Sequence, residues 1–97
     1  MTDRYRLRPA AVRDLEAIWD YTESRWGVGQ AETYLRQLWH HLRMLAAQPD
    51  LGRSCDEVRP GYYKYPAGSH LLFYRTTAAG IEVVRVLHER MDVKRHL

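Results

Sequence analysis

Hydrophobic and polar residues alternate strictly at the start of the chain. In Arg4–Arg8, three arginines lie on one face of an extended segment, and Tyr5 and Leu7 lie on the other. This alternation predicts a short, half-buried strand. Pro9 follows, and it suits the first turn of a helix because its missing N–H would have no partner there.

The pattern then changes to a helical period. From Ala10 to about Trp26, apolar residues recur at steps of three and four, which predicts an amphipathic helix. A second helix is expected from about Gln30 to Gln48, directly before Pro49. The short connection between them predicts an antiparallel helical hairpin. The expected apolar stripes are Val12, Leu15, Ile18, Trp19 and Thr22 in the first helix, and Ala31, Tyr34, Leu35, Leu38, Leu42, Leu45 and Ala46 in the second.

Strands dominate the second half of the chain. β-Branched and aromatic residues fill Gly68–Arg75 and Ile81–Asp92, and the turn-rich segment Thr76–Gly80 between them predicts a β-hairpin. A shorter strand is expected at Tyr62–Tyr65, and Leu51–Glu57 is expected to be an irregular connector. The resulting order is β-α-α-β-β-β.

Grouped strands beside two helices predict an α+β fold in which the helical hairpin covers one face of an antiparallel sheet. The other face is expected to be open. If Val84 and Val86 face the helices, Arg85 should point to the open face. The three arginines of the first strand should emerge there too, because Tyr5 and Leu7 belong in the core.

Charged side chains inside an apolar strand are costly unless they are paired or face a ligand. Arg85 and His88 are such residues. They could belong to a surface that binds phosphate or the carboxylates of a protein partner. Alternatively, Arg85 could be structural and pair with Glu82, Glu89 or a backbone carbonyl, and the residues alone leave both possibilities open. The candidate basic set is Arg75, Arg85, His88 and Arg90.

Length and charge narrow the class of protein. Ninety-seven residues suggest one domain spanning 1–97, with a single core and little room for an enclosed cofactor site. The net charge is +3, and the excess lies in residues 51–97, which suits an acidic partner. No apolar run approaches 18 residues and the first residues do not resemble a signal peptide, so a cytoplasmic protein that does not bind membranes is expected.

Metal and cofactor sites are not expected. His40 and His41 are adjacent on a helix and diverge by about 100°, so they cannot share an ion. The single cysteine, Cys55, cannot form an internal disulfide and is interpreted as an incidental free thiol. The helix aromatics are expected to serve core packing and contacts within the helical hairpin rather than nucleic-acid stacking. These aromatics are Trp19, Tyr21, Trp26, Tyr34 and Trp39.

Several segments taken together resemble the ParE branch of the RelE/ParE toxin superfamily. They are Asp14-Leu-Glu-Ala-Ile-Trp-Asp-Tyr21, Gln30-Ala-Glu-Thr-Tyr-Leu35, Gln48-Pro-Asp-Leu-Gly-Arg53, Gly68-Ser-His-Leu-Leu-Phe-Tyr-Arg75, Val84-Arg-Val-Leu-His-Glu-Arg-Met-Asp92 and Arg95-His-Leu97. The resemblance implies the toxin half of a type II toxin–antitoxin module, held inactive by a ParD-like antitoxin. It also implies DNA gyrase as the target, with inhibition by protein contact rather than by enzymatic action.

The RelE branch shares this fold but cuts messenger RNA on the ribosome, so it supplies the alternative function. Such a nuclease would use His88 as a base with Arg85 and Arg90. RelE-type nucleases commonly carry a tyrosine after the last strand, and the tail from Met91 to Leu97 has none. Direct sequence-specific DNA binding is not expected, because no ribbon-helix-helix or helix-turn-helix pattern occurs.

Two sets of site residues follow from this interpretation. The residues expected to contact the target are Arg75, Arg85, His88, Arg90, Lys94 and Arg95. An acidic, amphipathic antitoxin segment is expected to lie across the helical hairpin and the sheet edge. The residues expected to meet it are Arg4, Trp19, Tyr34, Leu38 and Arg53.

Overall fold

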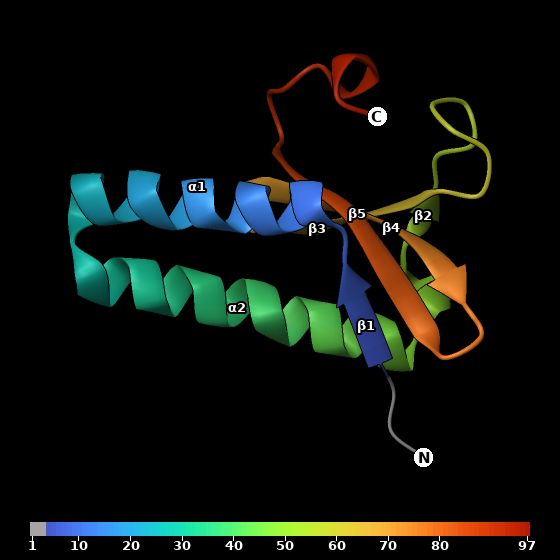
Figure 1. The fold of residues 1–97 in the computed structure, drawn as a ribbon, viewed down its shortest axis with the longest axis horizontal. Helices are drawn as coiled ribbons and strands as arrows, with labels where there is room; N and C mark the ends of the chain where they lie inside the picture. Colours follow the sequence, from blue (N-terminus) through green and yellow to red (C-terminus); the bar gives the residue numbers. More distant parts are fainter. Residues whose placement is uncertain (1–3) are drawn as a thin grey trace.

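The computed structural model describes residues 4–97. Two antiparallel helices pack against one face of a five-stranded sheet (Figure 1). This confirms the predicted α+β class. The elements in chain order are β1 (Arg4–Leu7), α1 (Pro9–Trp26), α2 (Val28–Ala47), the 3-10 helix η1 (Pro49–Leu51), β2 (Arg53–Ser54), β3 (Tyr63–Ala67), β4 (His70–Thr77), β5 (Gly80–His88) and the 3-10 helix η2 (Val93–Arg95).

The sheet is mixed, which corrects the prediction of a wholly antiparallel one. The strand order is β1-β5-β4-β3-β2, and β1 runs parallel to β5 with Tyr5 opposite Ile81. The helical hairpin is the crossover that a parallel pair requires. β5 is the most buried strand, and it is hydrogen-bonded to β1 on one side and to β4 on the other. The two-residue strand β2 also lies within the segment that was expected to be irregular.

The helical hairpin turns at a single residue, Gly27, which is shorter than the predicted break. Its φ of 91° favours glycine, and its N–H donates to the carbonyl of Glu23 at 2.8 Å. The carbonyl of Gly27 in turn accepts from the N–H of Ala31, so α2 begins earlier than expected. The tip of the hairpin projects well beyond the sheet (Figure 1).

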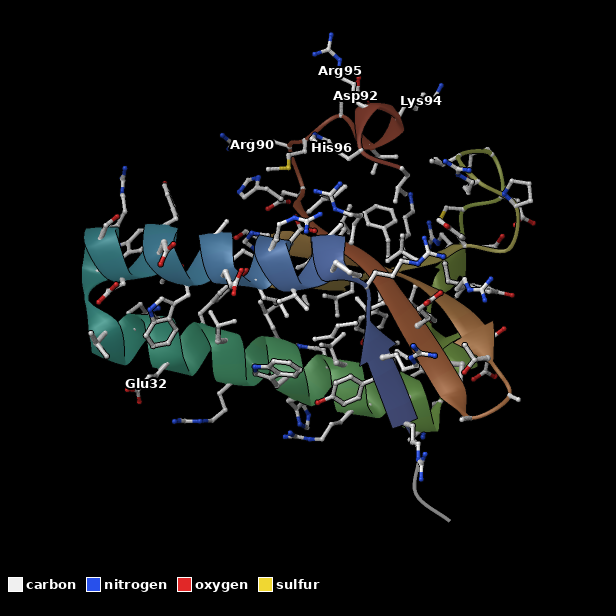
Figure 2. The ribbon with its side chains drawn as sticks, in the orientation of Figure 1. Glu32, Arg90, Asp92, Lys94, Arg95 and His96 are labelled. Atoms are coloured by element: carbon white, nitrogen blue, oxygen red, sulfur yellow. The ribbon has the colours of Figure 1, made fainter. Side chains whose placement is uncertain are left out.

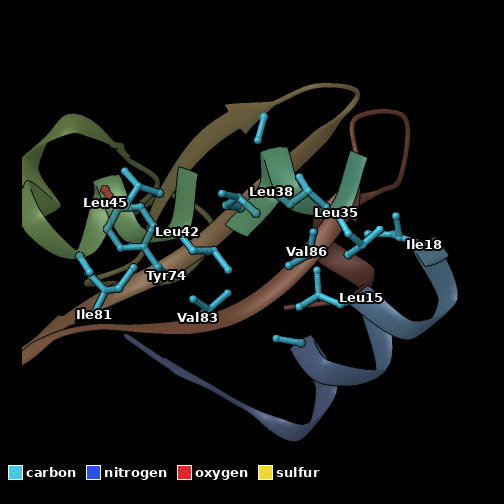
Figure 3. Packing of buried hydrophobic residues seen from close by; sticks show 14 residues of the cluster. Leu15, Ile18, Leu35, Leu38, Leu42, Leu45, Tyr74, Ile81, Val83 and Val86 are labelled. Atoms are coloured by element: carbon cyan, nitrogen blue, oxygen red, sulfur yellow. The ribbon is translucent and has the colours of Figure 1, made fainter. Parts of the chain in front are cut away.

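The main core lies between the hairpin and the sheet (Figure 3). Each leucine-sized side chain buried here contributes roughly 1.5–3 kcal/mol to folding. Ala11 is buried on α1, whereas Val12, which was expected in the stripe, is 39% exposed. The labelled members of the core are Leu15, Ile18, Leu35, Leu38, Leu42, Leu45, Tyr74, Ile81, Val83 and Val86.

A β-bulge changes which residues of β5 face the helices. Phe73 pairs with Arg85, but the next residue of β4, Tyr74, pairs with Val83, so Val84 is the extra residue. Val83 and Val86 therefore join the helix-side core. The simple alternation that grouped Val84 with Val86 was wrong because it did not allow for the bulge.

The second face of the sheet is partly covered, although the sequence predicted an open face. Cys55, Phe73 and Leu87 are buried there at 0–1% exposure. Part of the cover is the C-terminal tail, defined here as residues 89–97, which folds back over the strands (Figure 1). Neither helix in the described part of the chain is long and apolar enough to cross a membrane. The partly buried side chains packed on this cluster are Val58, Tyr62, Leu71, Val93 and Leu97.

Candidate functional site

A groove of about 580 Å³ lies between α1, the start of α2 and the ends of β4 and β5. We call it the α1 groove. Its walls are mostly apolar and aromatic, and its polar lining includes Asp14, Ser69, His70 and His88. A concave, largely apolar surface with a few converging polar groups is the usual form of a binding site. The apolar and aromatic residues that define it are Ile18, Tyr21, Trp26, Tyr34, Val86 and Met91.

The polar end of the α1 groove is built around Tyr34. Its hydroxyl accepts from the N–H of Ser69 at 3.0 Å and lies 2.6 Å from Nδ1 of His70. Because a backbone donor already points at the oxygen, the phenolic proton is best placed to donate to His70. Gly68 makes this approach possible, because a Cβ there would meet the Tyr34 hydroxyl at 2.7 Å. Its φ of 62° also favours glycine.

His88 stands opposite His70 on the neighbouring strand. The two residues pair directly in the β4–β5 register, and their ring centroids are 5.3 Å apart. Nδ1 of His88 accepts from the N–H of Arg90 at 3.2 Å. With Nδ1 of both rings accepting, the neutral tautomers carry their protons on Nε2. The donors of this histidine pair, both members of which line the groove, are therefore their Nε2–H groups.

Burial and charge favour the neutral form of His70. Removal from water lowers the pKa of His70, and the adjacent His88 lowers it further. The carboxylates of Asp14 and Glu89 act in the opposite direction, but they do not outweigh burial. His70 is therefore uncharged at neutral pH.

Arg85 is held by an acidic residue from a distant part of the chain. Its Nε and Nη2 donate to the two carboxylate oxygens of Asp14, each at 2.8 Å, and its Nη1 donates to the carbonyl of His96 at 3.1 Å. The carboxylate partner is therefore Asp14, which is 71 residues away in sequence, and not Glu82 or Glu89. The expected contact with a backbone carbonyl is present, at His96. The hydrogen bonds to Asp14 raise the pKa of Arg85 although burial opposes this. The Arg85 side chain is 22% exposed and faces α1 and the tail rather than an open surface.

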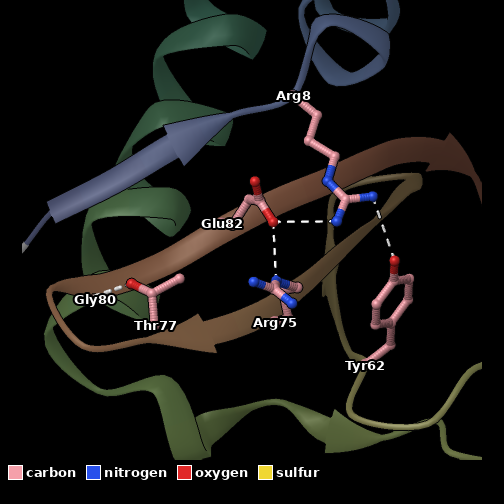
Figure 4. A network of polar contacts seen from close by, with 6 residues as sticks. All are labelled: Arg8, Tyr62, Arg75, Thr77, Gly80 and Glu82. Atoms are coloured by element: carbon pink, nitrogen blue, oxygen red, sulfur yellow. Dashed lines mark hydrogen bonds and ion pairs between the residues drawn. The ribbon is translucent and has the colours of Figure 1, made fainter.

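Arg75 is also paired, within a network on the outer part of the sheet (Figure 4). Glu82 Oε1 accepts from Nε of Arg75 at 2.9 Å and from Nη2 of Arg8 at 3.2 Å. Arg8 also donates to the Tyr62 hydroxyl at 3.3 Å. Burial opposes ionisation of Glu82, but these arginines outweigh it and lower the pKa of Glu82. Arg8 is thus held in this network rather than projecting freely from the sheet.

The C-terminal tail presents the other cations expected to contact the target. Arg90, Lys94 and Arg95 are exposed and point away from the body of the protein (Figure 2). Arg95 lies 3.9 Å from Asp92, but both side chains are more than 60% exposed, so this pair holds the tail only weakly. The structure therefore separates the predicted basic set into paired residues on the sheet and exposed residues on the tail.

The residues expected to meet an antitoxin fall into different environments. Arg4 and Arg53 are exposed, and Trp19 is half-buried against the core. Tyr34 lines the α1 groove. Leu38 is only 1% exposed, so its side chain is not available to a partner, and including it was wrong. It lies on the core-facing side of α2.

Sequence reasoning missed the exposed aromatic tip of the hairpin. Tyr21 and Trp26 are 57% and 61% exposed, so assigning them to core packing was wrong. The guanidinium of Arg25 lies 5.6 Å and 5.5 Å from the centroids of these two rings. A signal was present in the sequence, because Tyr21 and Trp26 fall outside the apolar stripe that was proposed for the first helix.

The cysteine and the adjacent histidines that the sequence offered as reactive or metal-binding groups are not arranged for such chemistry in the described part of the chain. Cys55 is fully buried, and burial raises the pKa of its thiol, so the thiolate that would react is disfavoured. Among residues 4–97, no group of three or more metal-ligating side chains comes together. His40 and His41 have their ring centroids 5.9 Å apart on the outer side of α2.

Comparison with known proteins identifies relatives over almost the whole chain. The family model described as "ParE toxin of type II toxin-antitoxin system, parDE" matches residues 5–93. "Toxin ParE1" of Mycobacterium tuberculosis (strain ATCC 25618 / H37Rv) is 62% identical over 98 residues, covering 100% of both chains. "Toxin ParE1" of Caulobacter vibrioides is 43% identical, covering 96% of each chain. "Toxin ParE" of Escherichia coli is 32% identical, covering 96% of this chain and 91% of the relative.

A solved structure has the same arrangement of helices and strands. It is a chain from a chromosomal ParDE TA system from P. aeruginosa, and it superposes with a TM-score of 0.76 over 91% of this chain and 95% of the other. The two sequences are 18% identical, so this likeness supports the fold alone.

Proposed function

This chain belongs to the ParE toxin family of type II toxin–antitoxin systems, and on that premise we propose that it inhibits DNA gyrase and is neutralised by a ParD-like antitoxin seated in the α1 groove. The observation that carries the proposal is the separation of two surfaces. One is a mostly apolar groove along α1, and the other is an outward-pointing cationic tail. Gyrase acts on DNA in the cytoplasm, so the proposal also implies a cytoplasmic toxin.

The chemistry of the α1 groove supports an acidic, amphipathic partner. Tyr21 and Trp26 offer large apolar rings at its outer end, while His70 and His88 present Nε2–H donors at its inner end. Asp14 is the acidic residue of the lining, and its charge is already paired with Arg85. A segment with apolar anchors and a carboxylate would satisfy both ends, and such segments commonly fold on binding.

Binding of the antitoxin tests the groove. Trp26→Ala should weaken affinity for the protein encoded beside the toxin gene by about 2 kcal/mol or more, because exposed tryptophans are frequent hot spots. Val12→Ala is the matched control, since Val12 is an exposed apolar residue of the same helix that does not line the groove. Equal affinities of the two variants in titration calorimetry would contradict docking in the groove. Failure of any coexpressed neighbour to restore growth would contradict a two-gene module.

The C-terminal tail is proposed to contact gyrase. Arg90, Lys94 and Arg95 are exposed there, whereas Arg75 and Arg85 are engaged within the protein. Free cations can pair with acidic groups on a target without breaking existing contacts. Contact alone requires no proton transfer by this chain, so the proposed toxin is not an enzyme.

Gyrase inhibition should depend on the tail and not on the titratable imidazole of His88. With purified gyrase, relaxed plasmid and ATP, His88→Gln should retain much of the inhibition. Replacement of Lys94 and Arg95 by alanine should lose most of it. Antitoxin binding should be unchanged by the paired replacement, because neither residue lines the α1 groove.

A ribosome-dependent nuclease remains the second candidate, with His88 as its base. The Nδ1 lone pair of His88 accepts from Arg90, and Arg85 is paired with Asp14, so both groups are already occupied. A nuclease that uses His88 should lose about 10²–10⁴-fold in rate on His88→Gln. Cleavage of ribosome-bound message together with normal supercoiling would replace the gyrase proposal with this one.

A further inference from the structure

Arg85 joins three segments of the chain, namely β5, the distant helix α1 and the C-terminal tail. It lies on β5, its Nε and Nη2 bind Asp14 of α1, and its Nη1 binds the carbonyl of His96 in the tail. Among the described residues, the bond to His96 is the one hydrogen bond that joins a side chain of the sheet to the backbone of η2 or its C-cap. Arg85 therefore connects the wall of the α1 groove to the C-terminal tail.

Asp14 fixes the direction in which the guanidinium points. The Oδ2 atom of Asp14 accepts two hydrogen bonds, one from Nε of Arg85 at 2.8 Å and one from the backbone N–H of Val86 at 2.9 Å. The Oδ1 atom accepts from Nη2 of Arg85 at 2.8 Å. The guanidinium is planar and its donors have a fixed fork geometry, so holding two of its nitrogens also orients the third. Nη1 is thereby directed toward His96.

The first residue of the tail is tied to the β3–β4 turn, because the N–H of Glu89 donates to the carbonyl of Ser69 at 2.9 Å. The far end of the tail, residues 93–97, has fewer contacts. Its 3-10 helix η2 is three residues long, and such short turns are not stable alone. Val93 and Leu97 pack on the cluster around Phe73 and Leu87. The intervening residues Lys94, Arg95 and His96 are exposed and gain little from packing.

We propose that Asp14 and Arg85 form a clamp that holds the C-terminal tail against the sheet and sets the position of Lys94 and Arg95. Asp14 is then a positioning residue, because it acts on the tail through Arg85. The consequence for gyrase rests on the proposed function above, whereas the clamp itself does not. An occupant of the α1 groove beside Asp14 would also lie next to the clamp, which links the two surfaces physically.

Amide hydrogen exchange of the free toxin tests the clamp directly. In Asp14→Asn, the amides of Arg95, His96 and Leu97 should exchange about tenfold faster or more, because a charge-assisted hydrogen-bond pair is lost. Amides of β4 and β5 should change much less, apart from that of Val86, whose N–H donates to Asp14 itself. Glu16→Gln is the matched control, since it removes an exposed carboxylate from the same helix without touching Arg85. It should leave tail exchange unchanged.

A second variant separates positioning from general stability. Arg85→Lys keeps the positive charge and can hold Asp14 at one point, but it cannot bind Asp14 and His96 in the same fork geometry. It should accelerate tail exchange while the sheet remains protected. Unchanged tail exchange in both variants would overturn the clamp. Equal acceleration in the tail and in β4 and β5 would also overturn it, because the pair would then be purely structural.

Gyrase inhibition by the same variants tests the functional consequence separately. A freed tail should reduce inhibition to a similar degree as alanine at Lys94 and Arg95. Faster tail exchange with undiminished inhibition would leave the clamp standing and contradict the proposed contact between the tail and gyrase. The two results therefore distinguish failure of the clamp from failure of the proposed function.

Discussion

The hydroxyl of Tyr34 lies 2.6 Å from Nδ1 of His70, and this contact joins α2 to the beginning of β4. The two rings are also close, with centroids 5.5 Å apart. The same hydroxyl accepts from the backbone N–H of Ser69 in the β3–β4 turn. One phenolic oxygen thus fixes both the turn and the tautomer of a histidine that lines the α1 groove.

Removal of this hydroxyl should weaken both folding and the groove. Tyr34→Phe leaves the Ser69 N–H and His70 Nδ1 without their partner, and each such loss costs about 1 kcal/mol when the group is partly buried. We expect the free energy of unfolding to fall by roughly 1–3 kcal/mol in urea denaturation. A change below the measurement error would show that water replaces the phenol at no cost.

Stability should fall as the pH drops below the ordinary titration range of histidine. The folded state lowers the pKa of His70, so the unfolded chain binds a proton more readily. This contribution is fully present above the unfolded pKa of about 6.5 and is lost as the pH falls toward the lower folded pKa. The groups that face His70 are Tyr34, His88, Asp14 and Glu89.

The matching experiment compares His70→Gln with His40→Gln, since His40 is exposed on α2. Melting temperatures measured from pH 7.5 to 5 should decline less steeply for His70→Gln than for the wild type. His40→Gln should follow the wild-type slope. Parallel slopes for all three proteins would mean that the folded state does not perturb His70.

Tyr74 should be important for anchoring η1 to the sheet. Its buried hydroxyl donates to the carbonyl of Pro49 at 2.6 Å and accepts from the N–H of Gly52 at 2.9 Å. Tyr74→Phe should destabilise the protein by about 1–3 kcal/mol, because both backbone groups lose their partner. Tyr63→Phe is the control, since its ring stacks on Tyr74 at 5.7 Å and its hydroxyl has no hydrogen-bond partner among the described residues. Equal losses of stability for Tyr74→Phe and Tyr63→Phe in thermal unfolding would contradict this role of Tyr74.

Local patterns predicted the elements of this fold well, for identifiable physical reasons. The helical period around Leu15 and Ile18, and the β-branched run from Ile81 onward, reflect burial on one face or both faces of an element. What the patterns did not contain was pairing between distant elements. β1 pairs with β5 in parallel. The bulge at Val84 also changes the face of the sheet to which the residues before it point. Neither follows from periodicity within a single segment.

The candidate site was harder to predict because it depends on partners far apart in sequence. The sequence singled out Arg85 and His88 as polar residues in an apolar strand. The carboxylate that binds Arg85 is Asp14, which is one of four acidic residues on α1, and the helical pattern alone does not distinguish it from the others. The groove exists because helix, turn and strand ends meet, so only a three-dimensional structure brings its lining together.

Glu82 provides a test of electrostatics on the outer sheet. The fold favours the charged form of Glu82, whereas it favours the neutral form of His70. Two arginines lower the pKa of Glu82, with burial acting against them, so the folded state favours the carboxylate. Stability from this network is present above the unfolded pKa of about 4.3 and is lost as the pH falls through the lower folded value. Because Arg8 and Arg75 are 38% and 49% exposed, solvent screens both pairs and the contribution should be only about 1 kcal/mol.

Glu82→Gln should therefore be less stable than the wild type at pH 7, and the difference should shrink as the pH is lowered toward 3. Raising the salt concentration at pH 7 should also reduce the difference, because the arginine partners are accessible to ions. Glu23→Gln is the control, since its carboxylate is exposed on α1 and takes part in no ion pair among residues 4–97. A Glu82→Gln deficit that stays constant from pH 7 to pH 3 would show that the side chain acts through packing and not through its charge.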